Sequence, residues 1–179
     1  MFSNFPASLN FILASEGGFS NHPLDPGGMT NLGVTKKAWE AYVGREVNET
    51  EMRALTIEIV SPFYKKNYWD SCKCDDLPRG IDYLVFDFAV NAGPRASIKI
   101  LQKALWIPED GLIGRITISA ATEYPANELI ELFSLAKEAY YKSLYTFSTF
   151  GKGWLNRVAA VQKNADAMIA AEITPTSRG

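Results

Sequence analysis

The stretch ILASEGGFSNHPLDPGGMTNLGVT, residues 12–35, holds the two patterns that decide the fold. Its first residues complete an amphipathic helix that the sequence predicts over residues 5–16, and two glycines then end that helix. One face of the helix carries residues at i, i+3, i+4 and i+7 spacing, namely Leu9, Ile12, Leu13 and Glu16. The following segment is dense in Pro, Gly, Asn and Asp, which is typical of turns. We therefore expect a helix followed by a small β-hairpin or β-meander near residues 19–35.

Helical patterns dominate the rest of the chain. The expected helices lie between residues 35 and 44, after the capping-box-like residues 48–51, and over residues 57–69, 80–92, 96–105, 117–123, 127–145 and 154–171. Within the turn-rich segment, Pro26 and Gly27 suit the centre of a type II turn. The Gly-Lys-Gly at residues 151–153 is expected to precede the last helix. The predicted fold is mainly α, a helical bundle with one small β-hairpin.

Composition excludes several classes of function. The net charge of −2 argues against general nucleic-acid binding, which requires a basic face. No apolar run approaches the roughly 18 residues of a membrane-spanning helix, so we expect no stable membrane insertion. The first residues lack a positively charged region, so we expect synthesis in the cytoplasm without a signal peptide. Cys72 and Cys74 are too few for a zinc site and are expected to stay reduced.

Glu16 is the most informative single residue. It occupies a position on the apolar face of the first helix, at the end where the helix dipole is negative. Both burial and that dipole would raise its pKa, and a carboxyl protonated near neutral pH is what a general acid needs. The alternative is a glutamate at the helix end that turns to solvent or pairs with a lysine or arginine.

The turn-rich segment offers partners for such an acid. A general acid acting on a glycosidic bond needs a second polar group to stabilise an oxocarbenium-like transition state or to place a water. Asp25 is a candidate for the negative charge, and Thr30 for orienting the water. Asp25 also suits a structural role in its own turn, and Thr30 suits an ordinary strand. His22 is interpreted as a residue at the rim of the site, with a catalytic base as the alternative.

The segment SEGGFSNHPLDPGGMTNLGVT, residues 15–35, resembles the signature of glycoside hydrolase family 108, the peptidoglycan-cleaving lysozymes of phages and prophages. That signature runs Glu-Gly-Gly-aromatic, then Asp-Pro-Gly-Gly-x-Thr, then Gly-Val-Thr or Gly-Ile-Thr. The resemblance implies a lysozyme-like α+β fold with Glu16 as the catalytic acid. The order Glu, Asp, Thr is also similar to the triad of phage-type lysozymes, which implies catalytic roles for Asp25 and Thr30.

Later segments extend the resemblance over roughly residues 8–170. YKKNYWD is similar to the Tyr-Trp element of the family, and FDFAVNAGP to its Asp-x-x-x-Asn-x-Gly helix end. DGLIG and GKGWLNRV resemble a C-terminal region described as a predicted peptidoglycan-binding domain. The resemblance thus implies a lysozyme-like catalytic region over residues 1–93 and a helical peptidoglycan-binding region over residues 94–179. No stretch resembling a flexible linker separates the two regions, so we expect them to pack together as one globule.

Four further residues are candidates for binding substrate. Asn91 ends the apolar stripe of the helix over residues 80–92, where its amide suits either an N-acetyl group or a helix cap. Tyr64, Tyr68 and Trp69 have a spacing that allows their rings to share a face, and flat rings stack well on sugars. The alternative for these three rings is a place in the core. Arg157 is expected to pair with a carboxylate, either Glu16 or Asp87.

The leading hypothesis is an endolysin-type N-acetylmuramidase that cleaves the β-1,4 bond between N-acetylmuramic acid and N-acetylglucosamine. Its partner is bacterial peptidoglycan, and no metal or organic cofactor is implied. We expect a monomer, and the resemblance implies that it depends on a separate holin-type membrane pore to reach the cell wall. Two alternatives are a lytic transglycosylase, which forms a 1,6-anhydro product, and a non-catalytic cell-wall-binding module.

Overall fold

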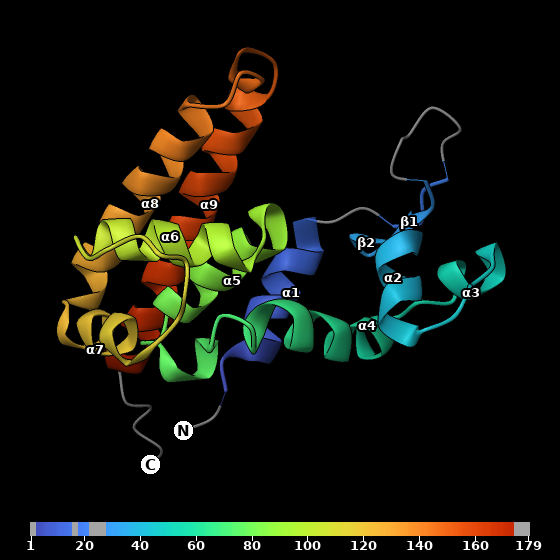
Figure 1. The fold of residues 1–179 in the computed structure, drawn as a ribbon, viewed down its shortest axis with the longest axis horizontal. Helices are drawn as coiled ribbons and strands as arrows, with labels where there is room; N and C mark the ends of the chain where they lie inside the picture. The colour runs from blue at the N-terminus through green and yellow to red at the C-terminus, as the bar shows by residue number, and fades with distance from the viewer. Residues whose placement is uncertain (1–2, 16–17, 22–27, 174–179) are drawn as a thin grey trace. The chain divides into compact units, whose positions relative to one another are not determined.

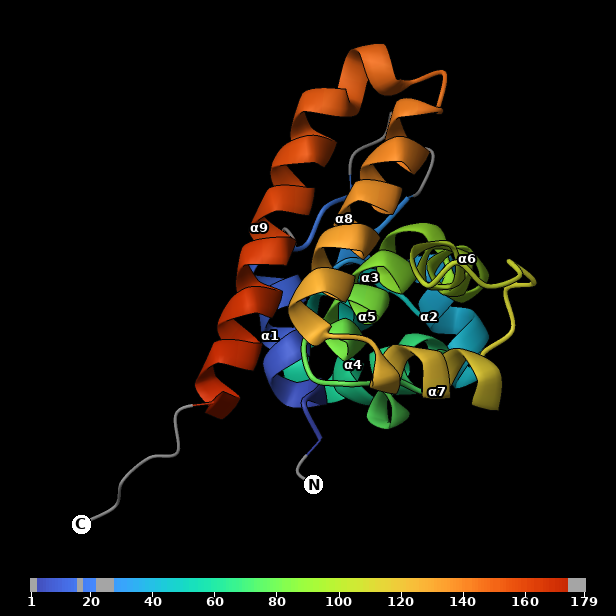
Figure 2. The same ribbon diagram turned by 90° about the vertical axis from the view of Figure 1, so that its left-hand side faces the viewer.

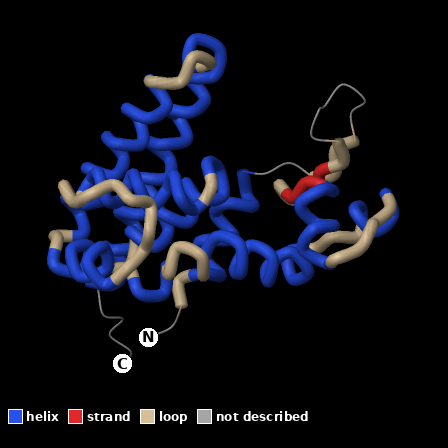
Figure 3. Tube along the Cα trace, viewed as in Figure 1, coloured by secondary structure: helices blue, strands red, loops and turns tan. Residues whose placement is uncertain are grey.

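The computed structural model describes residues 3–15, 18–21 and 28–173, and helices make up most of them (Figures 1 and 3). Among these described residues, the named strands form one antiparallel hairpin. This confirms the mainly α fold with a small hairpin. The chain divides into two compact units, Phe5–Asn67 and Met1–Asn4 with Tyr68–Gly179. The functional boundary that the sequence analysis expects at residues 93–94 stays a prediction.

The smaller unit contains α1, the hairpin and three further helices. Their bounds are α1 Phe5–Ser15, β1 Thr30–Asn31, β2 Val34–Thr35, α2 Lys36–Val43, α3 Glu49–Arg53 and α4 Ile57–Tyr64. Local signals set the ends of these helices. The Thr35 hydroxyl accepts a hydrogen bond from the backbone of Ala38 at the start of α2, and Gly44 ends that helix in the left-handed conformation. The capping box expected at residues 48–51 is present at the start of α3.

Helix α4 continues directly into a π-helix over Lys65–Trp69, so the helix expected over residues 57–69 is present in two forms. The larger unit then follows. Its elements are a 3₁₀ turn Cys74–Asp76, α5 Ile81–Ala92, α6 Pro94–Ala104, α7 Arg115–Glu123, α8 Ala126–Lys142 and α9 Phe147–Ile173. Both thiols, Cys72 and Cys74, are free and buried.

Helix α5 is the centre of the larger unit. Its residues 81–89 are all buried, because α5 packs against α6, α8 and α9. Helices α8 and α9 run side by side as an antiparallel pair, as Figures 1 and 2 both show. Gly93 ends α5 with φ 91°, and Pro94 starts α6 at the next residue. A single glycine therefore makes the turn between two packed helices.

The last helix differs from the prediction. Helix α9 begins at Phe147 and includes residues 151–153, which the sequence analysis placed before it. A Cβ atom on Gly151 would lie 2.6 Å from a ring carbon of Phe147. The lack of a side chain at Gly151 therefore leaves space for the Phe147 ring, and the glycine does not end the helix.

Candidate active site

The hairpin is built around a tight two-residue turn. Thr30 pairs with Thr35 and Asn31 with Val34. The turn residues Leu32 and Gly33 both have positive φ, 49° and 73°. Positive φ at both central positions is the mark of a type I′ turn, whose twist matches that of the two strands. The type II turn expected at Pro26 and Gly27 lies outside the described residues.

A third extended piece pairs with β1 on its other side. The Ser20 amide donates to the Thr30 carbonyl at 2.8 Å, and the Thr30 amide donates to the Ser20 carbonyl at 2.9 Å. Together with the hairpin, this bridge forms a small β-meander, one of the two arrangements, hairpin or meander, that the sequence predicted near residues 19–35. The Thr30 hydroxyl donates to the Gly28 carbonyl at 3.3 Å. Thr30 therefore has strand pairing on both sides and keeps part of its side chain accessible.

Helix α3 anchors the meander at several points. The Asn31 side-chain amide donates to the Met52 carbonyl at 2.8 Å. The Asn21 amide donates to the Glu49 carboxylate at 3.3 Å. The Arg53 guanidinium, paired with Glu49, lies 3.8 Å from the centre of the Phe19 ring. Phe19, Asn21 and Asn31 are thus tied to one short helix.

Helix α4 holds the turn of the hairpin. The Tyr64 hydroxyl donates to the Leu32 carbonyl at 2.8 Å. The Tyr64 ring is 1% exposed and packs edge to face against Phe63. Phe63 in turn contacts Trp39 and Tyr42 of α2, with ring centres 5.4–6.0 Å apart. The aromatic cluster of α2 and α4 therefore holds Tyr64 in place, and Tyr64 in turn holds the hairpin turn through its hydrogen bond to Leu32.

Three of the residues predicted for the site, Glu16, His22 and Asp25, lie outside the described residues. Their geometry relative to Thr30 stays a prediction. The catalytic candidate Thr30 does lie within the described residues. Its backbone is held by pairing with Thr35 on one side and Ser20 on the other.

The predicted substrate-binding residues occupy different environments. Trp69 is 0% exposed and packs edge to face on Phe86, with ring centres 5.3 Å apart. Trp69 and Tyr64 therefore present no free ring face to a sugar in this structure, as the core alternative for these rings expects. Tyr68 is half-buried, and burial raises the pKa of its hydroxyl. Asn91 is exposed on α5. Tyr68 and Asn91 stay candidates for contact with substrate.

A buried ionic cluster lies in the larger unit. The Asp87 carboxylate of α5 accepts hydrogen bonds from Lys137 of α8 at 2.6 Å and from Arg157 of α9 at 2.8 Å. The Arg157–Asp87 pair is one of the two that the sequence analysis proposed. Burial alone would raise the pKa of Asp87, but the two cations outweigh it and hold that pKa below its ordinary value.

Lys137 was missed by the sequence analysis, although a signal was present. It follows Ile130 and Phe133 at i+7 and i+4 on the buried face of α8. A lysine on an apolar stripe indicates a buried charge that requires a partner. Burial lowers the pKa of Lys137, and Asp87 opposes that shift.

Asp82 is a second buried carboxyl group. Unlike Asp87, it was not singled out by the sequence analysis. Its Oδ1 accepts hydrogen bonds from the backbone of Gly80 and Tyr83, at 2.8 and 2.7 Å, and from the Asn4 amide at 3.3 Å. Burial nevertheless raises the pKa of Asp82 to about 6.

Two further features are absent from the described part of the chain. Among the described residues, no group of three or more His, Cys, Asp or Glu side chains is arranged to hold a metal ion. None of the described helices has the length and apolarity needed to cross a membrane.

Comparisons with known proteins identify a matching family and a similar solved structure. The family profile described as Glycosyl hydrolase 108 matches residues 9–93, which include the C-terminal part of α1, the meander and α5. No protein with a curated description matches the sequence. Among solved structures, the chain is similar to SagA of Brucella abortus, with 41% sequence identity and a TM-score of 0.82. The similarity covers 92% of this chain and 95% of the SagA chain. The chain therefore belongs to the glycosyl hydrolase 108 family.

Proposed function

We propose that this glycosyl hydrolase acts on peptidoglycan as an N-acetylmuramidase, cleaving the β-1,4 bond between N-acetylmuramic acid and N-acetylglucosamine. The observation that carries the proposal is the family match over residues 9–93, which contains the Glu-Gly-Gly and Asp-Pro-Gly-Gly-x-Thr segments whole. Because peptidoglycan lies outside the cytoplasmic membrane, the enzyme would act at the cell wall.

Glu16 is proposed as the general acid that protonates the glycosidic oxygen. It directly follows Ser15, the last residue of α1. The carbonyl groups at that end of a helix carry partial negative charge, which disfavours an ionised carboxylate. A carboxyl group that stays protonated near neutral pH can donate its proton to the leaving group.

Asp25 and Thr30 are proposed as the groups that stabilise the developing cation or position the attacking water. The pairing of Ser20 with Thr30 supports this assignment, because it brings the two ends of the intervening segment to adjacent strands. The anchoring of residues 21 and 31 to α3 limits the motion of those ends. A preorganised polar group next to the reacting bond is more effective than one that must be ordered during the reaction.

The test is the variant Glu16→Gln, assayed by release of reducing sugars from purified sacculi. We expect a loss of activity of about 10²–10⁴-fold, the usual contribution of a general acid. Glu46→Gln is the matched control, because Glu46 is an exposed carboxylate of the same unit. Both variants should unfold at the wild-type temperature. Substantial activity in Glu16→Gln would remove Glu16 from the mechanism.

The products separate the proposed reaction from its alternatives. Mass spectrometry of the wild-type digest should show muropeptides that end in reducing N-acetylmuramic acid. A 1,6-anhydro end would instead identify a lytic transglycosylase. Binding to sacculi without any release of sugars would identify a cell-wall-binding module, and the proposal would then fail.

A further inference from the structure

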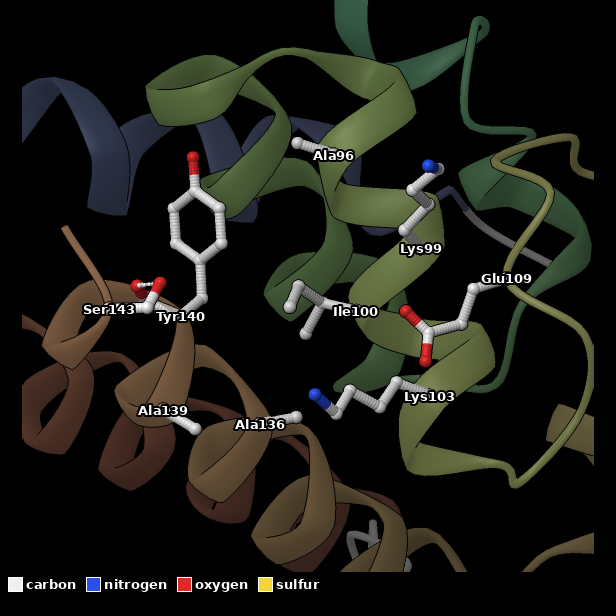
Figure 4. Close-up of a pocket in the computed structure, with 9 residues that line it drawn as sticks. All are labelled: Ala96, Lys99, Ile100, Lys103, Glu109, Ala136, Ala139, Tyr140 and Ser143. Carbon is white, nitrogen blue, oxygen red and sulfur yellow. Dashed lines mark hydrogen bonds between the residues drawn. The ribbon is translucent and has the colours of Figure 1, made fainter.

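A groove runs between α6 and α8 in the larger unit (Figure 4). Its first part is a cavity of about 270 Å³. Along the α8 side the walls are small side chains, Ala136, Ala139 and Ser143, with the Tyr140 ring among them. Ile100 of α6 adds an apolar surface. The α8 side therefore forms an apolar floor of mostly small side chains, which suits short aliphatic groups.

The α6 side of the groove is cationic. Lys99 and Lys103 stand one helical turn apart on the same face and both line the cavity. Within the described part of the chain, neither lysine forms an ion pair. Glu109 lies on the same wall in Figure 4, so the lining carries two positive charges and one negative charge. The groove thus offers two ammonium groups that have no ion pair with any described residue, above an apolar floor.

The groove continues into a second cavity of about 290 Å³, which shares Lys103 and Ala136 with the first. Its other walls include Trp106 and Leu135. Trp106 is 83% exposed and has a positive φ of 56°, a conformation that is strained for a residue with a side chain. The fold therefore holds a large apolar ring in water at this end, and such strained positions concentrate at binding sites.

We propose that this groove binds the stem peptide of peptidoglycan, and the proposal rests on the function proposed above. A stem peptide joins alanine residues to an acidic residue and a diamino acid. Alanine methyl groups match the small-residue floor of α8. The free carboxylates match Lys99 and Lys103, and the ammonium group of the diamino acid matches Glu109. The larger unit then grips the peptide that branches from the glycan strand.

The experiment uses a soluble tetrapeptide stem, L-Ala–D-Glu–diamino acid–D-Ala, titrated into the full-length protein by calorimetry. Saturable binding is expected for the wild type, and it should weaken with salt because the contacts are ionic. The double variant Lys99→Ala/Lys103→Ala should bind at least about tenfold more weakly. Lys163→Ala is the control, because Lys163 is an exposed lysine of α9. A tetrapeptide with amidated carboxylates should bind the wild type and the double variant equally weakly.

The peptide contains no glycosidic bond, so its binding does not depend on hydrolysis. Wild type that digests sacculi but shows no saturable peptide binding would overturn this inference and leave the proposed function standing. Undiminished binding in the double variant would overturn it as well. A wild type without activity on sacculi would instead remove the proposed function. Thermal unfolding of the variants checks that they fold. The variant Lys99→Gln/Lys103→Gln removes both charges but keeps part of each aliphatic side chain, and it should bind the peptide as weakly as the alanine variant.

Discussion

The hydroxyl of Tyr64 donates a 2.8 Å hydrogen bond to the carbonyl of Leu32, the first residue of the hairpin turn. Leu32 has φ 49°, a left-handed conformation that costs a residue with a side chain roughly 1–2 kcal/mol. The bond from α4 offsets part of that cost. Because β1 ends at Asn31, next to Leu32, α4 fixes the strand that carries Thr30.

Tyr64→Phe is expected to lower the free energy of unfolding by about 1 kcal/mol, since the partly buried carbonyl of Leu32 loses its hydrogen-bond donor. We also expect a lower turnover number on sacculi, because the strand with Thr30 loses one anchor. Urea denaturation and initial rates of sugar release measure the two effects. Tyr42→Phe is the control, because Tyr42 packs in the same aromatic cluster and lies on the neighbouring helix α2. Equal behaviour of the two variants would contradict a role for this hydrogen bond.

The Asp87 cluster makes a prediction about stability. Asp87→Asn removes the partner of a Lys137 ammonium group that is 1% exposed. Leaving such a charge unpaired costs about 3–5 kcal/mol. Arg157→Gln should cost less, because the Arg157 side chain is 24% exposed and water replaces part of the interaction. Chemical denaturation of both variants tests this order, and a larger cost for Arg157→Gln would contradict it.

The parts of the fold that sequence predicted well depend on neighbouring residues. Asn48 and Glu51 form the capping box three residues apart, and Gly44 supplies the left-handed residue that ends α2. The apolar stripe of α5 predicted a central helix because burial follows from its own composition. In each case the signal and the structure that it specifies lie within one or two helical turns.

The parts that sequence missed depend on contacts between distant residues or on irregular helix geometry. The Lys137–Asp87 pair joins positions 50 residues apart, so the local pattern around Lys137 indicates a buried charge but cannot identify its partner. The π-helix at Lys65–Trp69 uses about one more residue per turn than an α-helix, which changes the face that Tyr68 and Trp69 occupy. Spacing counted at 3.6 residues per turn therefore could not decide which rings are buried.

Asp82 predicts a pH dependence of stability that is opposite to that of most carboxylates. Burial raises its pKa from 3.8 to about 6 in the folded state. Between these values the folded protein holds a proton that the unfolded chain has released, so stability falls as pH rises. The contribution is complete below about pH 4 and is lost as pH rises through about 6, for a total of about 3 kcal/mol.

The comparison that isolates this effect is between the wild type and Asp82→Asn, which cannot titrate. The difference in unfolding free energy, wild type minus variant, should increase by up to about 3 kcal/mol when pH falls from 7 to 4. Asp76→Asn is the matched control, because Asp76 is an exposed aspartate of the same unit, and it should follow the wild-type profile. Urea denaturation at several pH values gives the three profiles. A difference that stays constant across this range would show that the three hydrogen bonds to Oδ1 outweigh burial and keep Asp82 ionised.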